Sequence, residues 1–239
     1  WAETWQMKFN VNKCSILRIH RIYIPIIHEY TMLNQTLGAS KHHPYLGVEL
    51  DQKLRFNHHI DNITNKATGT LNLLKRNLKH CSKPVKSQAF QTLVRPQLEY
   101  ASAVWDPFYD NDIKKLEMVQ RRGVRWVNND HTRGENSITK ERKILGWPTL
   151  EHRRLESRLV IFYKIINSQI AIPIPTYLNL ATRTTRQGTL YIRPRTSSSS
   201  YMESFFPRTV ADWNYLPKVV TSATTVESFK TQLSNHYNC

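Results

Sequence analysis

The sequence predicts an α+β fold that is mostly α, with a small β region followed by helices. Stretches rich in β-branched and aromatic residues stand near the start, at Ser15–Ile19, Ile22–Ile24 and Tyr45–Leu50. From residue 57 onward, apolar residues recur every three or four positions, which is the period of a helix with one buried face. With 239 residues, 40% of them hydrophobic, the chain is long enough to bury a real core.

The first two helices are predicted on either side of residue 81. Over 57–80, one apolar row contains Ile60, Ile63, Ala67, Leu71, Leu74 and Leu78. Ser82 is expected to cap the next helix, because Pro84 then falls in the first turn, where its missing N–H costs little. The apolar face of this second helix is expected to contain Val85, Ala89, Leu93 and Val94, and Pro96 should end or kink it.

A helix is expected to resume over Leu98 to Trp105, and three further helices are predicted along the rest of the chain. One begins at Asp110 or Asn111 and buries Ile113, Leu116, Val119, Val124 and Val127. Another is capped by Thr149 and buries Leu155, Leu159, Phe162 and Ile166. The last covers Val226 to Tyr237.

The charge favours a polyanionic partner, with nucleic acid as the expected class. The chain has 34 Lys and Arg against 18 Asp and Glu, a net charge of +16. The basic residues are clustered, since no acidic residue lies between Asp61 and Glu99. A basic surface that binds nothing is the alternative. The 7 glycines form neither a G-x-x-x-x-G-K-[ST] nor a G-x-G-x-x-G pattern, so the common nucleotide-binding loops are not expected.

No metal site is expected in this chain. The three cysteines (Cys14, Cys81 and Cys239) are far apart, and no Cys/His group has zinc spacing. His42-His43 and His58-His59 are adjacent pairs whose side chains diverge, which favours a solvated surface. No apolar run approaches the ~20 residues needed to cross a bilayer, and the start does not resemble a signal peptide. We therefore expect an intracellular protein with no membrane partner.

Five segments, taken together and in order, resemble LINE-type reverse transcriptases, the polymerases of non-LTR retrotransposons of the jockey, CR1 and L2 types. The segments are Trp5-Gln6-Met7-Lys8-Phe9-Asn10-Val11-Asn12-Lys13-Cys14, Tyr45-Leu46-Gly47-Val48, Val94–Ala101 with Trp105-Asp106-Pro107, Leu116–Arg122, and Ser204–Pro217. The resemblance implies three domains: the end of the polymerase palm in 1–55, a helical thumb in 56–134 and a C-terminal post-thumb region in 135–239.

The same resemblance implies that the metal-binding aspartates lie upstream of Trp1. No Asp-Asp pair occurs in the sequence, and Asp51 and Asp61 are expected to be surface or capping residues. The complete enzyme would use Mg²⁺, but no cofactor is expected in this fragment, which should not polymerise alone. A nuclear and cytoplasmic ribonucleoprotein is the location that the resemblance implies for the parent element.

Lys13 matches the D motif of the family, whose lysine would give a proton to pyrophosphate or steady the triphosphate. A plain surface lysine is the alternative. Tyr45, Leu46 and Gly47 match the primer grip, with an ordinary hairpin strand as the alternative.

Template RNA and primer DNA are the expected partners, held through phosphates by two groups of basic residues: Lys75, Arg76, Lys79, Lys83 and Lys86, and then Arg121, Arg122 and Arg125. The aromatic residues Trp105, Trp126, Trp147, Phe205, Phe206 and Trp213 are expected mostly in the core, with Trp213 the best candidate to stack on a base. RNA binding is also the expectation for 135–239, from its positive charge. A stand-alone basic module derived from a retroelement, and a degenerate copy, remain the alternatives.

Overall fold

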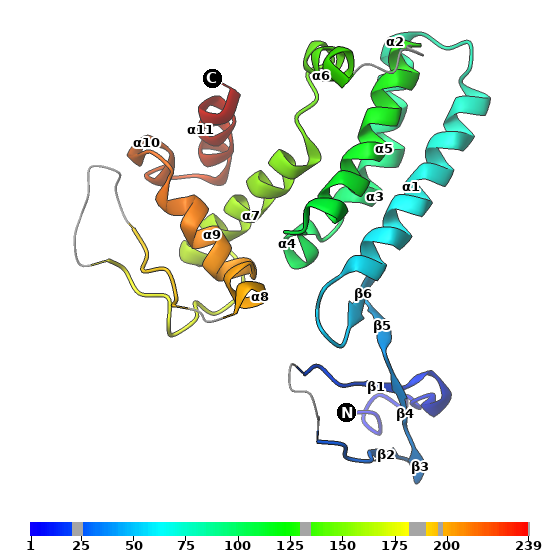
Figure 1. Cartoon of the computed structure of the whole chain (residues 1–239). Helices are drawn as coiled ribbons and strands as arrows, with labels where there is room; N and C mark the ends of the chain where they lie inside the picture. Colours follow the sequence, from blue (N-terminus) through cyan, green and yellow to red (C-terminus); the bar gives the residue numbers. More distant parts are fainter. Residues whose placement is uncertain (21–25, 130–134, 182–189, 196–197, 239) are drawn as a thin grey trace. The chain divides into compact units, whose positions relative to one another are not determined.

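The computed structural model of the chain describes residues 1–20, 26–129, 135–181, 190–195 and 198–238 (Figure 1). They divide into two units, Trp1–Asn65 and Lys66–Cys239. The predicted α+β, mostly α fold is confirmed, because all described strands are short and lie in the first unit, whereas helices form the second.

The first unit consists of short strands and the start of a long helix. Its elements are the 3₁₀ turn η1 (Val11–Lys13), β1 (Ser15–Leu17), β2 (Thr31–Met32), β3 (Gln35–Thr36), β4 (Gly38–Ser40), β5 (His42–Tyr45), β6 (Val48–Asp51) and the first residues of α1 (Asn57–Asn77). β1 pairs with β4 in parallel, whereas β2–β3 and β5–β6 are antiparallel pairs. The strand predicted at Ile22–Ile24 lies outside the described residues.

The stretch Tyr45–Leu50 is a hairpin rather than the single strand that the sequence predicted. Tyr45 pairs with Val48, and Leu46 and Gly47 form the two-residue turn between β5 and β6. Both turn residues have positive φ, 46° and 82°, as the favoured two-residue hairpin turn requires. Asp51 is buried rather than on the surface, and its carboxylate accepts backbone hydrogen bonds from Lys53, Arg55 and Phe56 in the turn before α1.

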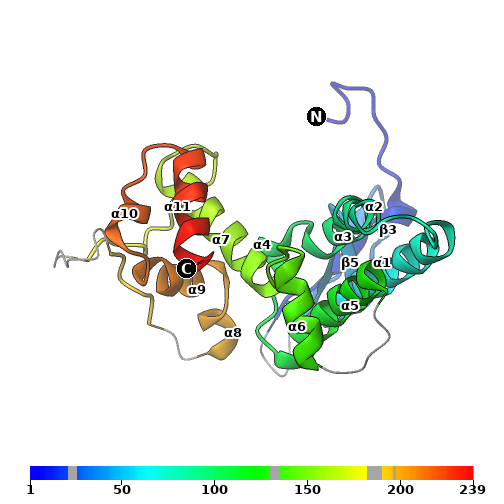
Figure 2. The same cartoon turned by 90° about the horizontal axis from the view of Figure 1, so that it is seen from above.

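The second unit contains the rest of α1 and all later helices. They are α2 (Lys83–Ala89), a π-helical turn η2 (Phe90–Val94), α3 (Arg95–Glu99), α4 (Ser102–Trp105), α5 (Asp110–Asn128), α6 (Glu135–Ile144), α7 (Leu150–Ile166), α8 (Ser199–Met202), α9 (Phe205–Asn214), α10 (Lys218–Thr221) and α11 (Val226–Asn238). α5 lies beside α1, and α7 lies against α9 and α11 (Figures 1 and 2).

The buried row of α2 and of the turn that follows it is shifted by one position along the chain from the predicted row. Val85 and Leu93 are exposed, whereas Lys86, Phe90 and Val94 form the buried row. Pro96 does not end the helix, because the π-helical turn before it carries the chain directly into α3. Lys86 is therefore drawn into the interior, with only 2% of its surface exposed.

The C-terminal half of the second unit has its own hydrophobic core. Trp213 lies between Phe162 and Phe229, with ring centroids 5.2 and 5.7 Å away. The Tyr163 hydroxyl donates to the carbonyl of Ala223 at 2.8 Å, so this core includes a satisfied polar contact. The buried residues of this core are Leu159, Phe162, Tyr163, Leu178, Val210, Trp213, Leu216, Val220, Phe229 and Leu233.

Candidate nucleic-acid interface

The two groups of basic residues that the sequence predicted meet where α1 lies beside α5. Burial lowers the pKa of Lys75 on α1, and repulsion from Arg122 on α5 lowers it further. These two cations therefore lie close enough to repel one another, although they come from separate helices. Arg76, Lys79, Lys83, Arg121 and Arg122 are all exposed to solvent.

The last turn of α1 offers a second, structural reason for its charge. Lys75 and Arg76 occupy that turn, where cations stabilise the partial negative charge of the helix C-terminus. This effect is worth about 0.3–1 kcal/mol per residue at an exposed site and leaves the ammonium and guanidinium groups free to contact phosphate. It therefore accounts for some of the charge, but not for Arg121 and Arg122 beside it.

Lys86 and Arg125 were predicted to contact phosphate, but they do not belong to this exposed set. The Lys86 ammonium donates to Asn129 Oδ1 at 2.8 Å and lies 6.0 Å from the ring centre of Trp126. The prediction that Lys86 lies on the basic surface is therefore wrong, because the helix buries the row on which it stands. Arg125 is half-buried, and its Nε is buried without a hydrogen-bond partner among the described residues. We define the basic set as Lys75, Arg76, Lys79, Lys83, Arg121 and Arg122.

The residues that match the palm motifs lie in the first unit. Lys13 is exposed at the end of η1. Tyr45 is 61% exposed and Leu46 76% exposed at the tip of the β5–β6 hairpin. Gly47 has the turn's positive φ, so the hairpin alone explains a glycine there. The exposed apolar tip still offers a surface to a partner.

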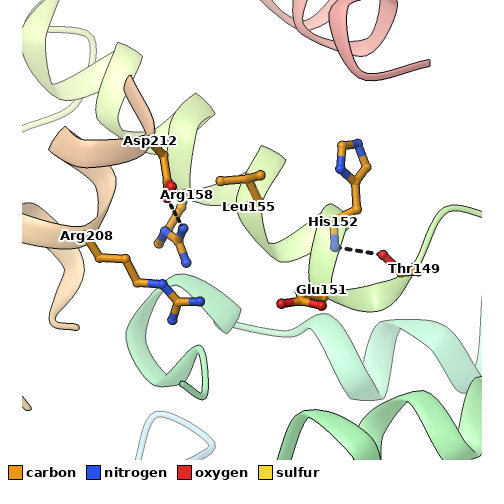
Figure 3. Close-up of a pocket in the computed structure, with 7 residues that line it drawn as sticks. All are labelled: Thr149, Glu151, His152, Leu155, Arg158, Arg208 and Asp212. Atoms are coloured by element: carbon orange, nitrogen blue, oxygen red, sulfur yellow. Dashed lines mark hydrogen bonds and ion pairs between the residues drawn. The ribbon is translucent and has the colours of Figure 1, made fainter. Parts of the chain in front are cut away.

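Buried ion pairs join α4, α7 and α9, and the sequence reasoning missed them. The Asp106 carboxylate follows α4 and accepts from Arg154 Nε at 2.7 Å and from Arg158 Nη1. Arg158 also forms an ion pair with Asp212 on α9 (Figure 3). Arg208 Nη1 lies 3.5 Å from Asp106. Arg158, Arg208 and Asp212 line a pocket of about 320 Å³. Arg208 also pairs with Glu203, so three carboxylates face the three arginines. They therefore hold helices together.

Other residues in the resembling segments also make structural contacts. Glu117 accepts from the backbone N–H of Glu151 at 3.0 Å and so caps α7; burial raises its pKa, and the hydrogen bonds and nearby arginines oppose that rise. Gln120 Nε2 donates to the carbonyl of Pro148 at 2.8 Å. These motif residues tie α5 to the start of α7, so the predicted thumb and post-thumb helices pack within one unit.

The aromatic residues mostly belong to the core, as predicted. Trp105, Trp147 and Trp213 are at most 3% exposed. The suggestion that Trp213 stacks on a base is wrong, because its side chain is buried, stacks on Phe229 and meets Phe162 edge to face. His59 is also buried, contrary to the predicted solvated surface, and its Nδ1 accepts from the N–H of Glu49 at 3.2 Å.

Neither a metal cluster nor a membrane helix is present among the described residues. No group of three or more His, Cys, Asp or Glu side chains is placed to hold a metal ion there. Across the same residues, no helix combines the length and apolar character that spanning a bilayer demands.

Comparison with known proteins points to a retrotransposon polymerase. The chain is similar to the RNA-directed DNA polymerase from the mobile element jockey of Drosophila melanogaster, with 27% identity over 145 residues. This match covers 54% of the chain and 14% of the relative's length. No family model and no solved structure matches the chain. The similarity supports a relationship to the reverse transcriptases of retrotransposons.

Proposed function

We propose that this chain is the C-terminal part of the RNA-directed DNA polymerase of a non-LTR retrotransposon. Residues 1–55 would be the end of the palm, 56–134 the thumb and 135–239 the post-thumb region. The similarity to the jockey polymerase and the ordered motifs support this proposal. Because the sequence contains no Asp-Asp pair, the chain would grip the template–primer and leave nucleotide addition to upstream carboxylates.

The main support for the gripping role is that Lys75 on α1 and Arg122 on α5 lie close enough to repel one another. These two cations repel one another in the free protein, and a polyanion bound across them relieves that repulsion. The other members of the basic set are exposed lysines and arginines, which suit contacts to phosphates rather than to base edges. The basic set would therefore hold the hybrid of template RNA and primer DNA without reading its sequence.

A triple charge reversal of Lys75, Arg76 and Lys79 to Glu tests this role. We expect weaker binding to two RNA–DNA hybrids of unrelated sequence, by the same factor for both, because phosphate contacts are shared by all sequences. The slope of log affinity against log salt should flatten by roughly 0.7–0.9 for each phosphate that the variant no longer neutralises. Fluorescence anisotropy over a range of salt concentrations measures both quantities.

The matched control reverses three exposed lysines elsewhere, Lys140, Lys218 and Lys230. It changes the net charge equally and should weaken binding far less. Salt-independent binding, or an equally weakened affinity in this control, would contradict the proposal.

We also propose the family roles of the two palm motifs. The hairpin tip Tyr45–Gly47 would touch the primer end, and Lys13 would serve the departing pyrophosphate or the triphosphate. The exposure of Lys13 and of the hairpin tip supports this proposal. A single-turnover nucleotide-addition rate that is unchanged by Lys13→Ala in the complete enzyme would exclude the chemical role of Lys13.

A further inference from the structure

A second basic region lies in the second unit, apart from the basic set. A groove of about 860 Å³ is bounded by α3, α6, the α6–α7 connection, α7 and α11. The lining residues that matter here are Arg95, Arg142, Lys143, Trp147, Arg153 and Tyr237. A groove of this volume is the size of those that hold small ligands, so it can take a nucleotide-sized group.

The charges that line the groove are mostly positive. Arg153 is neutralised by Glu99, to which its Nη2 donates at 2.9 Å. Burial lowers the pKa of Arg95, and repulsion from Arg153 lowers it further. Arg142 donates to the carbonyl of Trp147 rather than to a carboxylate. Lys143 is exposed and forms no ion pair with the residues that the structure describes.

The lining contains one acidic residue, Glu156, against the four cations Arg95, Arg142, Lys143 and Arg153. Glu156 Oε1 lies 3.2 Å from His152 Nε2. Its carboxylate is therefore engaged by a neighbour on its own helix. It also attracts Arg153, so it offsets part of the charge. Arg95 on α3 and Lys143 on α6 form no ion pair with the residues that the structure describes.

Trp147 adds an independent observation that points to a ligand. Its ring is 3% exposed and stacks on Phe90 with centroids 4.6 Å apart. Its Nε1 is buried without a hydrogen-bond partner in the described part of the chain. An indole N–H can only donate, and a buried donor without an acceptor is costly, so an acceptor oxygen from a ligand would satisfy it.

We propose that this groove binds a single strand of nucleic acid through its phosphates, an inference that rests on the proposed function. The phosphates of a duplex lie on a convex cylinder, whereas half-buried Arg95 is reached more easily by a flexible single strand. Arginine forks match phosphate oxygens, and the half-buried ring of Tyr237 lines the same groove. The groove thus serves an unpaired strand, and the basic set serves the hybrid.

The test uses the whole chain and a fluorescent oligouridine about 12 nucleotides long, within the usual range of single-strand site sizes. Arg95→Gln with Lys143→Gln should weaken oligouridine binding about tenfold at physiological salt and flatten the salt slope by about 1.4. Lys143→Gln alone changes an exposed residue and should weaken binding about fourfold. Thermal unfolding verifies that both variants fold.

The matched control is Lys140→Gln, an exposed residue of the same helix outside the groove. Unchanged oligouridine binding in both groove variants, or an equally weakened affinity in Lys140→Gln, would overturn the groove proposal. Equal competition by polyglutamate would also overturn it in favour of an acidic peptide. Binding of the RNA–DNA hybrid separates the groove proposal from the proposed function. The groove variants should bind the hybrid with unchanged affinity, whereas reversal of Lys75, Arg76 and Lys79 should lower that affinity.

Discussion

At the scale of single residues, Asp106 explains why counting charges along the sequence overstated the free positive surface. Arg154 and Arg158 contribute to the positive charge of the post-thumb region, yet both are buried beside this carboxylate. One signal was present in the sequence: the two arginines stand four residues apart in the row that begins at Leu150 and includes Phe162. Their carboxylate partners come from distant segments, which periodicity does not reveal.

Replacing Asp106 with Asn should destabilise the second unit. The side chain is 7% exposed and accepts from two buried arginines, so the change leaves buried positive charge uncompensated. Removing one partner of such a buried pair costs about 3–5 kcal/mol. Urea unfolding followed by circular dichroism measures the destabilisation. The control is Asp110→Asn at an exposed position, which should lower the free energy of unfolding by less than about 1 kcal/mol. Equal destabilisation by the two substitutions would contradict the account.

His59 should make the first unit less stable in acid. Burial lowers its pKa, the Glu49 carboxylate raises it by less, and its Nδ1 must stay unprotonated to accept from Glu49 N–H. The folded pKa lies below the unfolded value of about 6.5, so the unfolded chain gains the proton first. This contribution is therefore complete above pH ~6.5 and is lost as the pH falls through the lowered folded value.

Urea unfolding on either side of that range measures the effect. The decrease in stability between about pH 7.5 and 5.5 should be smaller in His59→Gln than in the natural chain. The exposed neighbour variant His58→Gln should keep the full decrease. The same decrease in all three proteins would contradict this account.

At the scale of elements, periodicity located the long helices and misplaced one face. The apolar row of α1 and the Thr149 cap of α7 are confirmed, since Leu71 and Leu74 are buried and Thr149 Oγ1 accepts from the His152 N–H at 3.1 Å. The predicted buried face of α2 was wrong because Lys86 occupies a buried position there. Its ammonium donates to Asn129, a tertiary contact that the local sequence pattern does not encode. Contacts of that kind also set the capping of α7 by Glu117.

Gly123 on α5 is predicted to be essential for the packing of α5 against η2. A Cβ at this position would overlap the ring of Phe90, which is itself stacked on Trp147. Gly123→Ala should therefore destabilise the second unit by about 1–3 kcal/mol, although alanine favours a helix by about 1 kcal/mol. Gly69→Ala on α1 meets no atom within 4 Å and should stabilise the protein instead. Thermal unfolding compares them, and a stabilised Gly123→Ala would contradict the packing.

At the scale of the whole molecule, the sequence predicted the fold class and every member of the basic set, together with Lys86 and Arg125, which do not belong to it. It did not predict that Lys75 and Arg122 lie together, or that the groove beside Trp147 exists, because both depend on how helices pack. The motifs behind the family resemblance divide by role. Asp106, Glu117 and Gln120 hold helices together, whereas Lys13 and Tyr45–Gly47 are exposed. Resemblance in the second unit therefore reports mainly on packing.

Single-turnover nucleotide addition by the complete polymerase tests most directly whether this chain grips the hybrid. With Lys75, Arg76 and Lys79 reversed to Glu, the template–primer concentration needed for half-maximal extension should rise about tenfold or more. The addition rate at saturating hybrid should stay within about twofold, because phosphate contacts away from the reacting atoms bind ground state and transition state alike. A slower addition rate with unchanged template–primer affinity would contradict the gripping role.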